Sequence, residues 1–200
     1  MDAYISTIKL IGFLFVFLYH LYPLTNSYYF IGVDIFFVLT GFLFGKKISN
    51  FDNKNNKNNK INKIHLFNYL FLKRIKKLYL PLISSVIIFT IPLILFFPNP
   101  LVNLKSSTAS LLFIQNIRLI RSSFNYFDNN NFDPFNHLWY LSVDFQSLLL
   151  ISLILVLFIN KRILKYFLYS IFIGSFIYFS YKHFNSENIN AYLNTFARIW

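Results

Sequence analysis

The chain has 200 residues, of which 56% are hydrophobic and 22% aromatic, while only 13% carry a charge. Soluble domains carry charge on about a quarter of their residues, so the composition excludes an ordinary soluble domain. Nineteen Lys and Arg face seven Asp and Glu, which gives a net charge of +12. In so apolar a chain this excess indicates basic loops beside membrane helices, and it does not favour nucleic-acid binding. The lack of cysteine excludes disulfides and thiolate metal sites.

Five apolar runs are long enough, or nearly so, to cross a bilayer, which takes about 20 helical residues. They are Ile5–Leu24, Tyr28–Gly45, Leu78–Phe97, Leu138–Ile159 and Ile163–Tyr181. A shorter run, Ala109–Ile117, cannot cross alone. The sequence therefore predicts an all-α, polytopic transmembrane helix bundle with about five spans. The short run is expected to form one re-entrant or interfacial helix.

A basic segment, Lys46–Lys77, separates the second and third runs and is expected to be a loop. It contains ten Lys and Arg against one acid, Asp52. Its centre, Asn53–Asn62, is a low-complexity Lys/Asn tract that is expected to be disordered. The positive-inside rule places this loop in the cytoplasm. The N-terminus is then cytoplasmic as well, and the protein is expected to be a multi-pass protein of the cytoplasmic (inner) membrane.

Among the ionisable residues inside the apolar runs, three stand out: His20, Asp34 and Asp144. Such groups are unfavourable in a membrane and usually functional. Counted from the run ends, each lies roughly 6–9 Å below the outer boundary, which predicts one polar layer with His20 beside Asp34. A histidine next to a carboxylate can act as a general base. The same pair could instead hold two helices together, and no spacing favours a metal site.

Lys9 precedes His20 by 11 residues, roughly 16 Å along a helix. It is expected at the opposite, cytoplasmic side. Four basic residues before the third run are expected there too, namely Lys73, Arg74, Lys76 and Lys77. Together they would form a basic collar at the inner mouth, although ordinary positive-inside anchoring explains the same residues.

Several segments together resemble the acyltransferase family 3 membrane proteins. The stretch from Lys9 to His20 is similar to the first family helix, whose motif is Arg, ten residues, then His. The segment GVDIFFVLTGFL at Gly32–Leu43 resembles GVDxFFVLSGFL. Three more segments, in the same order as in the family, are Lys73–Pro81, His137–Gln146 (HLWYLSVDFQ, similar to HLWSLSVEEQ) and Asn194–Trp200. Lys9 stands where the family has Arg, and Asp144 where it has Glu.

This resemblance implies O-acylation of bacterial cell-surface glycans. The donor would be acyl-CoA (often acetyl-CoA) on the cytoplasmic side, and the acceptor a hydroxyl of a glycan or lipid-linked sugar. It implies no permanently bound cofactor, metal or nucleic acid. The implied catalytic residues are His20, Asp34 and Asp144. The implied substrate-binding residues are Lys9, Lys73, Arg74, Lys77, His137, Trp139 and Gln146.

The matched segments cover residues 1–200 but only about half of a family domain, so the C-terminal half is expected to be missing. Two other functions fit the residues. Buried His and Asp also form the proton relays of proton-coupled transporters. An inactive fragment could also persist as a membrane scaffold.

Overall fold

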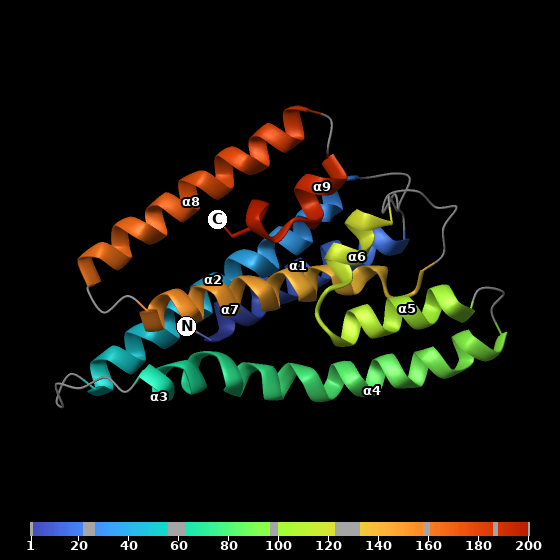
Figure 1. Cartoon of the computed structure of the whole chain (residues 1–200), viewed down its shortest axis with the longest axis horizontal. Coiled ribbons are helices and arrows are strands. Elements are labelled where there is room, and N and C mark those ends of the chain that lie inside the picture. The colour runs from blue at the N-terminus through green and yellow to red at the C-terminus, as the bar shows by residue number, and fades with distance from the viewer. Residues whose placement is uncertain are drawn as a thin grey trace. The chain divides into compact units, whose positions relative to one another are not determined.

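The computed structural model describes residues 2–21, 27–55, 63–96, 100–122, 133–157, 161–185 and 188–199. All regular structure in these ranges is helical (Figure 1), which confirms the predicted all-α class. The chain divides into two compact units, Met1–Ile61 and Asn62–Trp200. The sequence predicts a single partial domain, whereas the structure contains these two units, which are taken in turn below.

The first unit is a helical hairpin. It consists of α1 (Asp2–Leu21), the 3₁₀ turn η1 (Ser27–Phe30) and α2 (Ile31–Asn55). The two long helices pack at two glycines, because a Cβ atom added to Gly32 would lie 2.7 Å from the carbonyl oxygen of Gly12. Small residues allow membrane helices to approach this closely. The Gly12–Gly32 crossing therefore fixes the register of the hairpin.

The second unit begins with one continuous helix made of α3 (Lys63–Phe67), the π-helical turn η2 (Asn68–Leu72) and α4 (Lys73–Phe96). Two short helices and a 3₁₀ turn follow. A long helical pair and a short C-terminal section complete the unit. These later elements are α5 (Pro100–Leu111), α6 (Gln115–Arg121), η3 (Asn136–Leu138), α7 (Trp139–Leu157), α8 (Lys161–Phe184), α9 (Asn188–Leu193) and η4 (Thr195–Ala197).

Four helical stretches in the described part of the chain are long and apolar enough to cross a membrane. They are Ala3–Leu21, His65–Phe96, Asn136–Leu157 and Arg162–Phe184, and they match four of the five predicted spans. The fifth prediction, Tyr28–Gly45, falls on η1 and α2 but is not among them, since α2 carries Asp34, Lys46 and Lys47. Large apolar side chains such as Phe89 and Phe176 are exposed, as expected for helices that face lipid. The protein is an integral membrane protein.

The predicted loop Lys46–Lys77 is wrong at both ends, because helices occupy them. The second helix, α2, continues to Asn55, and helical structure is present again from Lys63. Neither flank contains Gly or Pro after Gly45, and Lys is a good helix former. Residues 56–62, which hold most of the Lys/Asn tract, lie outside the described residues.

The predicted short helix Ala109–Ile117 is broken in the middle. The α5 helix ends at Leu111, Phe113 adopts a φ of 55°, and α6 begins at Gln115. Helices of 12 and 7 residues reach only about 18 and 10 Å, less than the roughly 30 Å of a bilayer core. Neither helix is therefore long enough to cross alone, as predicted, and the segment is a helix–break–helix element.

The break is also the centre of the core of the second unit. The Phe113 ring stacks on Phe145 of α7 with centroids 4.1 Å apart. Apolar side chains of α4 and of the segment before α7 complete this core. Its buried members are Leu82, Val86, Leu93, Phe113 and Phe135.

The α4 and α7 helices are antiparallel and strongly offset. Leu141 near the start of α7 packs against the cluster that contains Leu82 and Val86, about halfway along the helix that begins at Lys63, and Phe145 contacts Phe71. Figure 1 shows α7 beside the first half of this helix and α5 beside the second half. The helix from His65 to Phe96 has 32 residues, about 48 Å, so it is longer than the membrane is thick. Because α7 is offset along this helix, the basic residues Lys73, Arg74, Lys76 and Lys77 lie level with α7.

Candidate functional site

The hairpin places His20 and Asp34 apart. Contacts of Gly32 with Gly12, Phe15 and Val16, and of Tyr19 with Phe30, set the register of the two helices. Asp34 is then level with about residues 10–15 of α1, and His20 lies roughly 7–15 Å farther along the axis. Asp34 is also rotated about 200° from Gly32 around α2, away from α1. The predicted direct His20–Asp34 pair is therefore not formed within the hairpin.

His20 lies in the last turn of α1 and its side chain is exposed. Its ring packs edge-on against Tyr19, with centroids 5.5 Å apart. Lys9 is exposed on the same uninterrupted helix. Eleven residues advance an α-helix by about 1,100°, close to three full turns. Lys9 and His20 therefore lie on one face of α1, roughly 16 Å apart.

Asp144 pairs with a member of the predicted basic collar. The Nη2 atom of Arg74 lies 3.2 Å from Oδ2 of Asp144, and the two side chains are 25% and 10% exposed. The sequence predicted Asp144 at the outer side and Arg74 at the inner side. That prediction was wrong, because the helix that contains Arg74 begins at Lys63, fifteen residues before Leu78, and α7 is offset along it.

The other collar residues are exposed around this pair. Lys73, Lys76 and Lys77 all point away from the core, and the Nζ atom of Lys73 lies 5.4 Å from the centre of the Tyr69 ring. Among the described residues of this stretch, four cations therefore accompany the single carboxylate of Asp144. Such a surplus of positive charge suits an anionic ligand.

The remaining predicted binding residues lie in η3 and α7 and differ in burial. His137 is exposed, whereas Trp139 is completely buried and belongs to the packing of the unit. The side chain of Gln146 donates to the carbonyl of Phe113 at 2.7 Å, and it also bonds to Asn116 and accepts from Thr195. Gln146 thus joins α7 to the helix break and to the C-terminal section.

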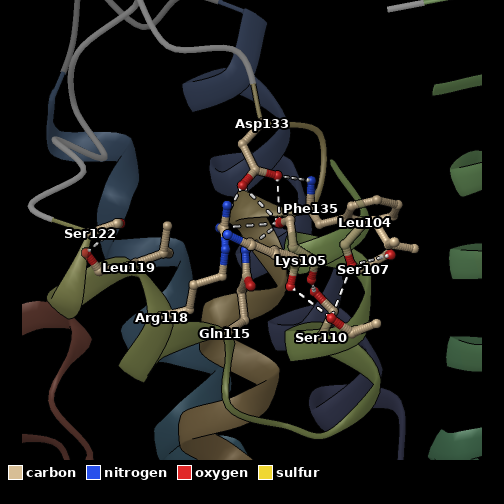
Figure 2. A network of polar contacts seen from close by, with 12 residues as sticks. Leu104, Lys105, Ser107, Ser110, Gln115, Arg118, Leu119, Ser122, Asp133 and Phe135 are labelled. Atoms are coloured by element: carbon tan, nitrogen blue, oxygen red, sulfur yellow. Dashed lines mark hydrogen bonds and ion pairs between the residues drawn. The ribbon is translucent and has the colours of Figure 1, made fainter. Parts of the chain in front are cut away.

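A second polar cluster was not predicted from the sequence. Figure 2 shows the buried carboxylate of Asp133 between α5 and α6. It lies 2.7 Å from Nη1 of Arg118 and 2.7 Å from Oγ of Ser106, and it accepts from the backbone N–H of Phe135. The Gln115 amide lies 2.8 Å from the same serine oxygen. We call Ser106, Gln115, Arg118 and Asp133 the Asp133 cluster.

One sequence signal could have revealed this cluster. Ser110, Gln115 and Asn116 interrupt the apolar run Ala109–Ile117, and Ser106 lies one helical turn before Ser110. Polar side chains in such a setting are expected to be buried and hydrogen-bonded to each other. The described residues thus separate into buried polar groups that join helices and exposed groups that are open to ligands.

The fold and these groups define a helical integral membrane protein with a surplus of cations beside its apolar helices. A family model described as an acyltransferase domain (acyltransferase family 3) matches residues 2–200. The chain therefore belongs to the acyltransferase family 3.

Relatives point in the same direction. The O-acetyltransferase OatA of Staphylococcus aureus (strain NCTC 8325 / PS 47) is 27% identical over 190 residues, which cover 92% of this chain and 30% of the relative. The protein SACOL0978 of S. aureus (strain COL) is 27% identical over 200 residues, covering 96% and 32%. The chain thus spans about a third of the length of these curated relatives. No solved structure matches it.

Proposed function

We propose that the protein is a membrane O-acyltransferase that moves an acyl group, often acetyl, from acyl-CoA to a hydroxyl of a cell-surface polysaccharide or glycolipid. The family match over residues 2–200 carries this proposal. The relatives named O-acetyltransferases support it. The surplus of cations around Arg74 supports an anionic donor, because phosphate groups bind well to clustered Arg and Lys.

In the proposed reaction His20 is the general base. Its imidazole takes the proton of the acceptor hydroxyl while the hydroxyl oxygen attacks the thioester carbonyl carbon. The C–S bond then breaks, the thiolate of CoA leaves with the electron pair, and it takes the proton back from the imidazolium. The products are an O-acyl ester and free CoA. The exposed position of His20 at the end of α1 suits contact with both substrates.

Cationic groups of each unit are proposed as donor contacts. In the first unit this is Lys9, which lies on the same face of α1 as His20, roughly 16 Å away. In the second unit they are Lys73, Arg74 and Lys77. Asp34 is proposed as a further carboxylate of the active site that acts separately from His20, and His137 as a contact for the acceptor. Trp139 and Gln146 are instead assigned to packing, because their side chains are buried or bonded to the chain.

Mass spectrometry of the surface glycans tests this function directly. Strains with and without the complete reading frame that encodes this chain should be compared, with isotope-labelled acetate supplied to the cells. We expect labelled O-acyl esters in the first strain alone. Equal acylation in both strains would contradict the proposed function and would favour the transporter or scaffold alternatives.

We also propose that the protein lies in the cytoplasmic membrane, with the N-terminus and the Lys46–Lys77 segment on the cytoplasmic side. Ten basic residues beside two apolar helices support it. Single cysteines introduced by Asn56→Cys and Ser27→Cys can be probed with an impermeant maleimide in right-side-out vesicles. Labelling at position 27 but not 56 is expected, and the opposite pattern would reverse the orientation.

A further inference from the structure

We propose that Asp144 is the resident counter-ion of Arg74 and that a phosphate group of the donor replaces it when the donor binds. This inference rests on the proposed function, in which the donor is an acyl-CoA. It assigns Asp144 a role in donor affinity and removes it from the catalytic residues that the sequence predicted.

The geometry of the pair is that of a contact that can be exchanged. Charge-assisted N–H···O bonds usually measure about 2.7–2.9 Å, and the Arg118–Asp133 pair of the same unit measures 2.7 Å. The Arg74–Asp144 contact is longer, at 3.2 Å. The Arg74 and Asp144 side chains are 25% and 10% exposed, against 18% and 1% for Arg118 and Asp133. An anion from outside therefore reaches the Arg74 guanidinium somewhat more readily, and the carboxylate that it must displace is more accessible.

The charge around the pair favours the same exchange. Lys73, Lys76 and Lys77 are exposed within one turn of Arg74, so the described residues of this stretch carry a positive surplus even while Asp144 is in place. A phosphate group brings more negative charge than a carboxylate and can accept both prongs of a guanidinium. In the donor-free protein Asp144 balances the charge of Arg74 among apolar helices.

Binding of coenzyme A, measured calorimetrically with the complete protein in detergent, tests the exchange. Asp144→Asn removes the competing charge and keeps the shape, so coenzyme A should bind about three- to tenfold more tightly. Asp144→Glu keeps the charge and adds reach toward Arg74, so binding should weaken by about two- to threefold. Arg74→Gln should weaken binding as well, and adding Asp144→Asn to it should then change nothing.

The Asp133 cluster supplies the matched control. Asp133→Asn removes the other arginine-paired carboxylate of the unit and should leave the affinity for coenzyme A unchanged while it lowers thermal stability. The probe 3′,5′-ADP, which has the 3′-phosphate and one 5′-phosphate but no pantetheine arm, should show the same ranking of variants.

The proposal is overturned if Asp144→Asn weakens binding, if Asp144→Glu tightens it, or if Asp144→Asn has the same effect with Gln at position 74. It is overturned as well if Asp144→Asn leaves binding unchanged and lowers the rate constant of transfer a hundredfold, which is the result for a catalytic carboxylate. Wild-type protein that binds coenzyme A without transferring acyl groups would contradict the proposed function and leave this inference standing. Wild-type protein that binds no coenzyme A would contradict the inference.

Discussion

The Asp133 cluster and the cations around Arg74 differ in how the chain satisfies their charges. Asp133 is buried and accepts hydrogen bonds from Arg118, Ser106 and a backbone N–H. Arg74 is partly exposed, holds its carboxylate at 3.2 Å and lies among exposed lysines. Polar groups that are buried and satisfied join helices, whereas exposed and surplus charges are open to a ligand.

The largest effect expected from this comparison is that of His20→Ala on acyl transfer. His20 is exposed, so its removal should leave the protein level in the membrane unchanged. Loss of a general base lowers the rate by about 10²–10⁴-fold. Glycan acylation and membrane-fraction protein should be measured together in cells that express the complete protein.

Thr7→Ala is the control for this variant, because Thr7 is another exposed polar residue of α1 that bonds only locally, to the carbonyl of Ala3. It should keep full activity. Normal acylation by a well-expressed His20→Ala protein would remove His20 from the catalytic machinery.

Asp133→Ala should give the opposite result, a loss of stability. It leaves the part-buried guanidinium of Arg118 without its carboxylate. Breaking a fully buried pair in this way is destabilising by about 3–5 kcal/mol, and we expect about 3 kcal/mol or less for this part-buried one. Thermal unfolding of the purified protein in detergent measures the change. Ser122→Ala, which removes a hydroxyl bonded to the carbonyl of Leu119 at the exposed end of α6, should change stability by no more than about 0.5 kcal/mol. Equal melting temperatures for the two variants would contradict the structural role of the cluster.

Gly32→Ala tests the packing of the hairpin on which the position of His20 depends. Its Cβ would lie 2.7 Å from the oxygen of Gly12 and 2.9 Å from the Cβ of Phe15, and such overpacking is destabilising by about 1–3 kcal/mol. Gly41→Ala on the same helix meets nothing within 4 Å and should be neutral or stabilising by up to about 1 kcal/mol. If both alanines have the same effect on thermal unfolding, the close crossing of α1 and α2 is wrong.

Lys9→Ala should have the smallest effect, because Lys9 is exposed and would be one of several cations at the donor. We expect the apparent KM for acyl-CoA to rise by about two- to fivefold, the range of an exposed charge interaction, with kcat unchanged. Lys9→Arg should match or improve on wild type, since a planar fork suits a phosphate. An unchanged KM in the alanine variant would make Lys9 a membrane anchor only.

The helices themselves could be predicted from the sequence because hydropathy and length decide which segments cross a membrane. Four of five runs were found in this way, and the short run Ala109–Ile117 was recognised as unable to cross. The break at Phe113 carries no such signal. A positive φ is usually associated with glycine, but here Phe113 adopts it, and its ring stacks on Phe145.

The arrangement of the polar residues could not be predicted, because hydropathy does not encode how far one helix slides along another. Counting residues from the run ends placed His20, Asp34 and Asp144 in one layer. The Gly12–Gly32 contact sets a register in which Asp34 lies away from His20 along the hairpin axis and faces away from α1. The offset of α7 brings Asp144 into contact with Arg74. Trp139 was assigned to binding by resemblance, yet it is completely buried. Helix register is set by individual packing contacts that a single sequence does not reveal.

The most direct test of the division between structural and functional polar groups is the specific activity of two variants in the same membranes. Transfer of labelled acetyl from acetyl-CoA should be divided by the amount of folded protein for His20→Ala and for Asp133→Asn. The account predicts that Asp133→Asn retains wild-type activity per folded molecule while less of it is folded, and that His20→Ala is fully folded and inactive. Folded Asp133→Asn protein without activity, or active His20→Ala protein, would contradict it.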